Sequence, residues 1–218
     1  LMKSKKQLLE MRASVRLGLN KSKGLSDFLA FCSGITLETG MTWKMPANAM
    51  IEDIYLDNAK SIVVLKSAQT GGTTAMMLRI LYAFYTKRLK LGAVIFFPTE
   101  SACSDFSRTR LAPVIRNNKI LSRMFDRDST NSILLKMGNN LPLFLRGLVS
   151  PMQARSFSAD ILGLDESDLA PDLFLEMANK RLLASDIRET FMVSTPGLPG
   201  QGISKAYSNS SQGRVIQV

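Results

Sequence analysis

A glycine-bearing loop between a strand-like run and a helix-like run most constrains how this chain can fold. The loop, Lys66–Thr74, has the sequence Lys-Ser-Ala-Gln-Thr-Gly-Gly-Thr-Thr. It follows the apolar run Ile62–Leu65 and precedes the helix-like Ala75–Leu81. Strand, tight loop and helix in this order are the context of a P-loop, whose backbone N–H groups and helix N-terminus hold phosphate oxygens. The segment therefore predicts a nucleotide site at the end of a strand.

The loop departs from the usual pattern G-x-x-x-x-G-K-[ST] at two positions. Gly71 and Thr73 fit, whereas Lys66 replaces the first glycine and Gly72 replaces the lysine. A lysine stem is long enough to reach the β- and γ-phosphates from the first position of the loop, and Thr73 keeps the hydroxyl that would bind Mg²⁺. On this segment alone, a Gly/Thr-rich turn after a buried strand remains an equal alternative.

A second motif follows at the spacing of a nucleotide-binding domain. The segment Ala159–Glu166 is an apolar run that ends in two adjacent carboxylates. Buried parallel strands have such runs, and ligands bind at their C-terminal ends. Asp165 could hold the Mg²⁺ shell, and Glu166 could deprotonate the attacking water. The alternative is that the acidic pair caps a helix starting near Pro171.

The alternation of strand-like and helix-like segments predicts an α/β fold with a mainly parallel, doubly covered sheet. Helices are expected over Ile51–Asn58, Ser101–Ile115 with Ser101 as N-cap, and Leu173–Leu183. The strands expected besides those named above are Gly92–Phe97, a hairpin of Ser132–Met137 and Leu141–Arg146, a strand around Phe191, and Arg214–Val218.

Composition excludes several classes of protein. The chain has no histidine, which removes histidine metal sites, Ser-His-Asp triads and histidine bases. Cys32 and Cys103 are too few and too far apart for a metal site and are expected to be free thiols. No apolar run approaches the roughly 18 residues of a membrane span. Of the net charge of +10, residues 1–24 carry +6. They predict a basic helical appendage that contacts DNA or a partner, or packs on the main domain.

Four motifs together resemble the ATPase motor domain of phage terminase large subunits, in the lambda-like branch. They are Lys66–Thr74, Ser150–Ser156, Ile161–Asp168 with Pro171, and Ser194-Thr195-Pro196. The resemblance implies a P-loop NTPase fold of the ASCE type, with ATP and Mg²⁺ as cofactors. It divides the chain into an N-terminal appendage, residues 1–42, and an ATPase domain, residues 43–218. The nuclease domain of this family would lie outside the chain, so no DNA cleavage is expected.

The resemblance also assigns roles to individual residues. Phosphate binding falls to Lys66, Ser67, Ala68, Gln69, Thr70, Gly71, Gly72, Thr73 and Thr74, metal binding to Thr73 and Asp165, and activation of water to Glu166. Ser194, Thr195 and Pro196 would couple hydrolysis to movement, or merely begin a turn. Arg155 would act as an arginine finger in a neighbouring subunit, or form a surface ion pair. Trp43 would stack on the adenine, or anchor the core.

The implied function is the motor that hydrolyses ATP to move double-stranded DNA into a procapsid in the host cytoplasm, away from membranes. The implied partners are DNA, the portal protein, the small terminase subunit and further copies in a ring of five, with the isolated domain monomeric. Two alternatives stay open. A helicase-like or remodelling ATPase would share the first two motifs but would more often have Ser-Ala-Thr at residues 194–196. A degenerate P-loop domain, marked by Gly72, would be an assembly module.

Overall fold

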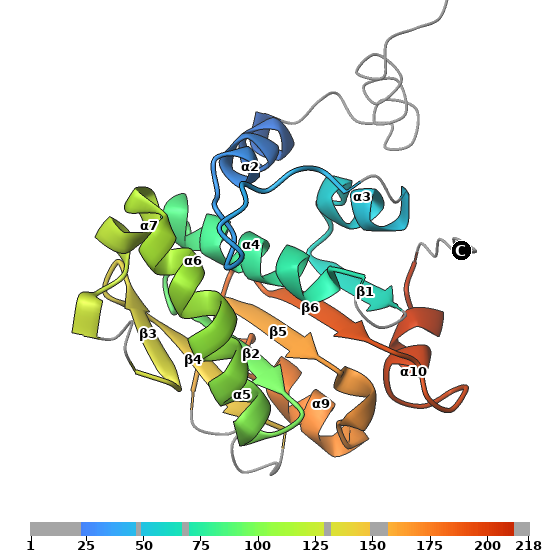
Figure 1. Ribbon diagram of the computed structural model, residues 1–218. Coiled ribbons are helices and arrows are strands. Elements are labelled where there is room, and N and C mark those ends of the chain that lie inside the picture. The colour runs from blue at the N-terminus through green and yellow to red at the C-terminus, as the bar shows by residue number, and fades with distance from the viewer. Residues whose placement is uncertain (1–22, 47–48, 67–69, 129–131, 149–156, 212–218) are drawn as a thin grey trace, which may run out of the picture.

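The computed structural model describes residues 23–46, 49–66, 70–128, 132–148 and 157–211 and contains a six-stranded sheet (Figure 1). The strand order is β1-β6-β5-β2-β4-β3. All neighbouring pairs are parallel except β3 and β4. The strands are β1 Ser61–Leu65, β2 Ala93–Phe97, β3 Leu135–Gly138, β4 Leu141–Gly147, β5 Ile161–Asp165 and β6 Glu189–Ser194. The prediction of a mainly parallel sheet is confirmed. Its five parallel strands end at one side, here called the carboxyl edge.

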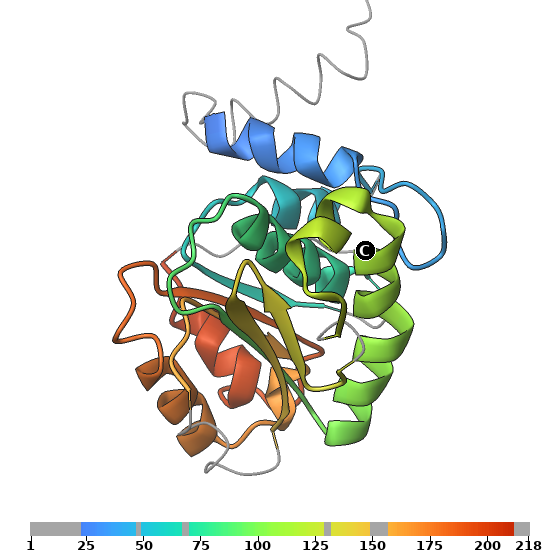
Figure 2. The ribbon, with the colours of Figure 1, turned by 90° about the vertical axis from the view of Figure 1, so that its left-hand side faces the viewer.

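Helices cover both faces of the sheet, as a parallel sheet requires. On one face lie α2 Lys23–Ser33, α3 Ala49–Leu56, α4 Gly72–Tyr85, α5 Glu100–Phe106, the π-helical η1 Ser107–Leu111, α6 Ala112–Asn117 and α7 Lys119–Met124 (Figures 1 and 2). On the other lie α9 Asp172–Lys180 and α10 Gly202–Ser208. The 3₁₀ turn η3 Ser167–Leu169 follows β5. Alternate residues of β2 enter the two hydrophobic cores, because successive side chains on a strand point to opposite faces.

The predicted hairpin is present, with a shorter first strand. Its turn is made by Asn139 and Asn140, whose φ values are +50° and +63°. Two central residues with positive φ define the turn that suits the twist of a two-residue hairpin, and asparagine tolerates that conformation best after glycine. The two asparagines therefore fix the register of β3 against β4.

The helix predicted at Ser101–Ile115 differs from the observed one at its start and in its middle. Ser101 as N-cap was wrong: the hydroxyl oxygen of Thr99 accepts from the N–H of Ala102 at 3.1 Å. The helix then widens into the π turn η1 before it continues to Asn117. The helices α7 and α10 were not predicted. The expected strand Arg214–Val218 and the N-terminal basic helix lie outside the described residues.

The helix α2 belongs to the main core. Phe28 and Phe31 pack in the same hydrophobic cluster as α4, and the Phe31 ring lies 5.4 Å from that of Tyr82. The proposed boundary between residues 42 and 43 therefore does not coincide with a break in packing. For residues 1–22, which are outside the described chain, the appendage stays a prediction.

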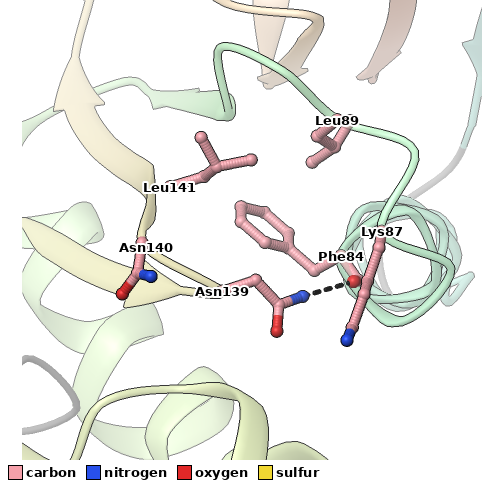
Figure 3. Close-up of a pocket in the computed structure, with 6 residues that line it drawn as sticks. All are labelled: Phe84, Lys87, Leu89, Asn139, Asn140 and Leu141. Carbon is pink, nitrogen blue, oxygen red and sulfur yellow. Dashed lines mark hydrogen bonds between the residues drawn. The ribbon is translucent and has the colours of Figure 1, made fainter.

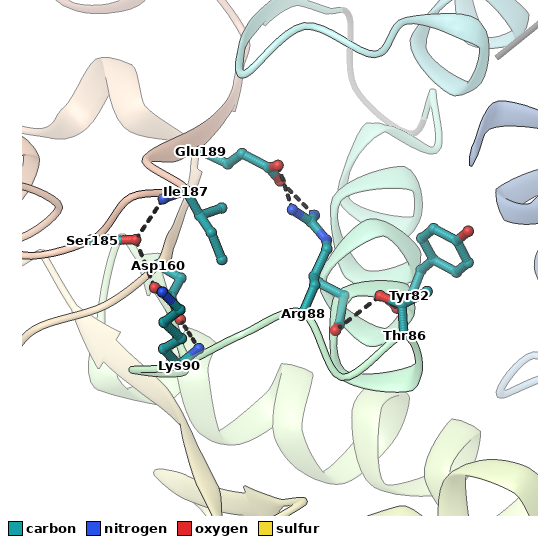
Figure 4. Close-up of polar contacts among 9 residues, drawn as sticks. Tyr82, Thr86, Arg88, Lys90, Asp160, Ser185, Ile187 and Glu189 are labelled. Carbon is teal, nitrogen blue, oxygen red and sulfur yellow. Dashed lines mark hydrogen bonds and ion pairs between the residues drawn. The ribbon is translucent and has the colours of Figure 1, made fainter. Parts of the chain in front are cut away.

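A buried carboxylate anchors the side of the sheet opposite the carboxyl edge (Figure 4). Asp160, 1% exposed, accepts from the backbone N–H groups of Lys90, Leu91 and Gly92 and from the hydroxyl of Ser185. These bonds join the chain entering β2 to the chain entering β5 and β6. The starts of three strands are thus held by one side chain.

A cavity of about 330 Å³ lies at the C-terminal end of α4, beside the hairpin turn (Figure 3). It is lined by Phe84, Lys87, Leu89, Asn139, Asn140 and Leu141. The P-loop is at the other end of α4, a helix of 14 residues, and so lies roughly 20 Å away at 1.5 Å per residue. This cavity is therefore separate from the candidate active site.

Candidate active site

The displaced lysine of the loop meets the acidic pair at the carboxyl edge. The backbone N–H of Lys66 donates to the carbonyl oxygen of Ser194 at 3.0 Å, which extends the pairing of β1 with β6 by one residue. From there the Lys66 side chain, mostly buried, reaches Glu166, and Nζ lies 2.8 Å from Oε1. The residues that directly follow β1 and β5 are thereby brought into contact.

The structure explains why a glycine occupies the usual lysine position. A Cβ atom on Gly72 would lie 2.7 Å from Cγ1 of Val193 and 3.3 Å from Cδ of Lys66. The first distance is shorter than real Cβ contacts, so a side chain at position 72 would displace β6 or the lysine stem. The stem of Lys66 thus fills space next to the position from which a lysine normally extends.

The start of α4 presents backbone donors at this point. Gly71 is the N-cap, with φ +84°, a conformation open to glycine and strained for other residues. It provides no side-chain acceptor for the N–H groups of the first turn. These groups and the helix dipole favour an anion at this end of α4. A helix N-terminus next to a lysine side chain fits the phosphates of a nucleotide.

Thr73 and Asp165 form the oxygen pair expected for a metal. The Thr73 hydroxyl donates to Oδ1 of Asp165 at 3.0 Å. Burial raises the pKa of Asp165, opposed by the hydrogen bond from Thr73 and the charge of Lys66. Among the described residues, no group of three or more His, Cys, Asp or Glu side chains could hold a metal alone. Mg²⁺ commonly takes one or two protein oxygens, with phosphate oxygens and waters as its other ligands, so this donor set fits Mg²⁺ bound with a nucleotide.

Glu166 is held at both carboxylate oxygens. It directly follows β5 and has φ +50°. Oε1 faces Lys66, and Oε2 accepts from the Ser194 hydroxyl and the Thr195 N–H, each at 3.2 Å. Burial raises the pKa of Glu166, but the hydrogen bonds from Lys66 and Thr195 and the charge of Lys66 outweigh it and hold the pKa below its usual value. The carboxylate is therefore charged and well oriented.

The expected coupling residues adjoin this carboxylate. Ser194, fully buried, contacts Glu166 and also accepts from the N–H of Asp168 at 3.2 Å. Asp168 in turn accepts from the N–H of Ile203 at 3.2 Å, so the acidic turn is linked to α10. Pro196 follows in the exposed loop. Asp168 was not assigned a role from the sequence, although its place two residues after the acidic pair, at the end of the motif Ile161–Asp168, was a signal.

The other predicted site residues fall into two groups. Ser67, Ala68, Gln69 and Arg155 lie outside the described residues, so their roles stay predictions. Trp43 is 7% exposed, with its ring centroid 4.9 Å from that of Tyr55. This packing fits the core anchor that had been left open as an alternative, and the stacking on adenine stays a prediction.

The acidic pair does not cap the helix that follows it. The N-cap of α9 is Pro171, which has no side-chain cap bond. The capping interpretation was therefore wrong. A residue missed altogether is Arg110, whose guanidinium donates to the hydroxyl of Thr74 in the first turn of α4. Only the tertiary fold brings these two residues together, so the sequence offered no signal for the contact.

Comparison with known proteins identifies the family of the chain. The family model of the ATPase domain of the phage terminase large subunit gpA matches residues 40–216. The chain belongs to this family. The resemblance seen in the sequence motifs is thus confirmed.

This terminase ATPase domain is similar to the large terminase subunit of Enterobacteria phage P21, at 26% identity over 168 residues. The match covers 71% of this chain and 26% of that protein, so the chain spans about a quarter of its relative's length.

Two solved structures share the fold of this terminase ATPase domain. The large terminase ATPase domain of Thermus phage P74-26 has a TM-score of 0.62 at 16% identity, with 91% of this chain and 78% of that chain covered. The large terminase of another thermophilic bacteriophage has a TM-score of 0.55 at 16% identity, covering 96% of this chain and 43% of that one. The expected P-loop NTPase type of α/β fold is confirmed. In the described part of the chain, no helix is both long and apolar enough to cross a membrane.

Proposed function

We propose that this terminase ATPase domain binds ATP with Mg²⁺ at the carboxyl edge and hydrolyses it to move double-stranded DNA into a procapsid. The family gives ATP hydrolysis as the general activity. The observation that carries the residue assignment is the meeting of Lys66, Thr73, Asp165 and Glu166 around the N-terminus of α4. Phosphoryl transfer depends on positioning and charge stabilisation, which this arrangement can supply.

Each side chain has a defined part in this proposal. Lys66 and the first N–H groups of α4 would hold the phosphates, and Thr73 with Asp165 would hold Mg²⁺. The ion, when bound, supplies positive charge that offsets the charge of the phosphate oxygens. Glu166 would accept the proton of the attacking water at Oε1. Because Lys66 occupies that oxygen in the structure, the ion pair has to open before Glu166 can act as a base.

The two alternatives differ in how they account for the site. The Ser194-Thr195-Pro196 segment and the family match favour the packaging ATPase over a helicase-like enzyme. A degenerate module would need no lysine at the phosphate site. The burial of the Lys66 side chain beside Glu166 argues against lost activity, because burying an ammonium group costs free energy that a structural role does not require.

The partners and the assembled state are also part of the proposal. The relative from phage P21 is a terminase large subunit, and terminase function implies duplex DNA, a portal protein and a small subunit as partners. A ring of five copies in the host cytoplasm, monomeric as an isolated domain, would place Arg155 near the neighbour's nucleotide, where it could act as an arginine finger.

The test compares Lys66→Ala with Lys60→Ala, which removes an exposed lysine just before β1. Binding of Mg·ATP is measured by calorimetry and hydrolysis by steady-state phosphate release. The wild-type chain and Lys60→Ala should bind and hydrolyse, while Lys66→Ala should bind about tenfold to hundredfold more weakly, since a charge-assisted hydrogen bond is lost. Equal binding by both variants would refute the role of Lys66. DNA transport requires the full-length protein, with ATP-dependent protection of duplex DNA in procapsids as the readout.

A further inference from the structure

A second cation lies beside the first turn of α4, on a different side from Lys66. Arg110 donates from Nη2 to the hydroxyl of Thr74 at 2.6 Å and from Nε to Oε1 of Glu38 at 3.1 Å. Thr74 directly follows Thr73, whose hydroxyl contacts Asp165. The guanidinium therefore adjoins the helix end at which the phosphates of ATP are proposed to bind.

The backbone around Arg110 has an unusual conformation. Arg110 lies in η1, a π turn within the otherwise α-helical stretch from α5 to α6, on the same face of the sheet as α4 (Figure 2). A π turn inserts one extra residue, costs stability and is frequently found at functional sites. Here the next residues, Leu111 and Ala112, enter the core, while Arg110 is directed at Thr74.

Glu38 fixes the orientation of this guanidinium. It lies in a short loop closed by the bridge between Thr36 and Thr42, and its side chain is 22% exposed. Its second oxygen, Oε2, is buried and has no hydrogen-bond partner among the described residues. A buried carboxylate oxygen without a partner costs stability, and a functional purpose of the charge would explain why it is kept. Orienting an arginine toward a ligand is such a purpose.

The guanidinium keeps donors for a further ligand. The contacts to Thr74 and Glu38 use Nε and Nη2, and Nη1 has no hydrogen-bond partner in the described part of the chain. The side chain is 30% exposed. Arginine presents its N–H groups in a planar fork that matches phosphate oxygens.

We propose that Arg110 is a phosphate-binding residue of the ATP site, which acts within its own subunit and is oriented by Glu38. This inference rests on the proposed function, because it places Arg110 against the phosphates that Lys66 and α4 hold. Lys66 and Arg110 then flank the first turn of α4 as two cations. Unlike Arg155, Arg110 needs no neighbouring subunit.

The experiment measures Mg·ATP affinity by calorimetry for the wild-type chain, Arg110→Gln and Arg88→Gln. Arg88 is a matched control because it also pairs with a glutamate, Glu189, and is 35% exposed, but lies away from the P-loop. Arg110→Gln should bind about tenfold or more weakly, the loss expected for a charge-assisted phosphate contact. Arg88→Gln should bind as the wild type does. Equal affinities of Arg110→Gln and the wild type would overturn the inference.

A second probe separates phosphate binding from other contacts. Magnesium tripolyphosphate has no base or sugar. Its affinity should fall from the wild type to Arg110→Gln by a factor similar to the fall for Mg·ATP. If only the nucleotide weakens, Arg110 contacts the nucleoside and the inference is wrong. Failure of the wild-type chain to bind either probe would instead refute the proposed function, so the two failures are distinguishable.

A purely structural role for Arg110 makes a different prediction. Thr74→Val removes the hydroxyl but keeps the cation. If Arg110 only fastens α4, Thr74→Val and Arg110→Gln should both lower the melting temperature without nucleotide and leave tripolyphosphate affinity unchanged, which would overturn the inference.

If Arg110→Gln does not fold, Glu38→Gln and Arg110→Lys replace it. Each should weaken tripolyphosphate binding by about threefold. Glu38→Gln loses the orientation of the guanidinium, and Arg110→Lys loses its planar fork, while the positive charge stays in both. Unchanged binding in both would contradict the inference.

Discussion

Lys66 and Glu166 lie 100 positions apart in the sequence and form an ion pair of 2.8 Å. Each is the other's only ion-pair partner among the described residues, and each is assigned to a different step of hydrolysis. The ion pair keeps the carboxylate of Glu166, the proposed base, charged, but places the Lys66 ammonium against its Oε1 atom. Binding of an anion by Lys66 would therefore uncover Glu166, which links substrate binding to activation of the base.

The acidic pair should separate binding from catalysis. Glu166→Gln should bind Mg·ATP as tightly as the wild type or more tightly, because Lys66 no longer has to give up an ion pair with Glu166 when it binds phosphate. Hydrolysis should fall about 100-fold or more, because the base that accepts the proton of water is lost. Asp165→Ala should lose the Mg²⁺ dependence of binding. Calorimetry with and without Mg²⁺, combined with steady-state assays, measures both effects. Glu176→Gln, on the exposed side of α9, is the control. If Glu166→Gln and Asp165→Ala lose binding equally, the pair is structural.

Gly72 should not tolerate even one added carbon. Gly72→Ala puts a Cβ 2.7 Å from Val193, so the free energy of unfolding should fall by about 1–3 kcal/mol, and nucleotide binding should weaken as Lys66 is displaced. Gly34→Ala is the control, because its Cβ would meet ordinary contacts at 3.5 Å. Val193→Ala in the Gly72→Ala background should restore part of the loss, measured as a coupling energy in a double-mutant cycle. Strictly additive effects would mean that this contact is not the cause.

Asp160 should be essential for stability and irrelevant to the nucleotide. Asp160→Asn removes the charge that three backbone N–H groups and Ser185 share, which should lower the free energy of unfolding by about 2–4 kcal/mol. Denaturant unfolding measures the loss. Asp186→Asn is the control, since its ion pair with Lys90 is exposed and should contribute little. An equally small effect in both variants would contradict the anchoring role of Asp160.

The stability of the domain should depend on Glu166 at acidic pH. The folded pKa of Glu166 is below its usual value, so as the pH falls the unfolded chain takes up this proton first. The contribution of Glu166 is thus complete above the usual glutamate pKa and is lost as the pH drops through the lowered folded value. The difference in unfolding free energy between wild type and Glu166→Gln should therefore shrink as the pH falls from the usual glutamate pKa through the lowered folded value. A difference that stays constant would show that the Lys66 contact does not perturb Glu166.

Much of the fold was predictable because a parallel sheet covered on both faces needs apolar strands. β1, β2 and β5 are short apolar runs that end at polar or turn residues, and each was located within one or two positions. The helix α10 was missed because a seven-residue helix after a Pro/Gly-rich loop has too few turns to show a hydrophobic period. The π turn in η1 was missed because it has no local sequence pattern.

The site residues also divide into those that the sequence predicted and those that only the structure revealed. Residues that act through a local motif, such as Thr73, Asp165 and Glu166, were found because the strand–loop–helix order fixes their place. Trp43 was ambiguous because a lone tryptophan fits a core and a ligand equally well, and its packing against Tyr55 became visible only in three dimensions. The contacts of Arg110 and Asp168 join segments that no spacing rule relates.

The tight space above Gly72 has a consequence for how related chains can vary. Gly72, Lys66 and Val193 occupy one volume, so a change at one of them alters what the others can be. A chain that returned the lysine to position 72 would need a smaller residue at 193 and would no longer need a long cation at 66. These three positions, two in the loop and one on β6, are therefore expected to change together during evolution.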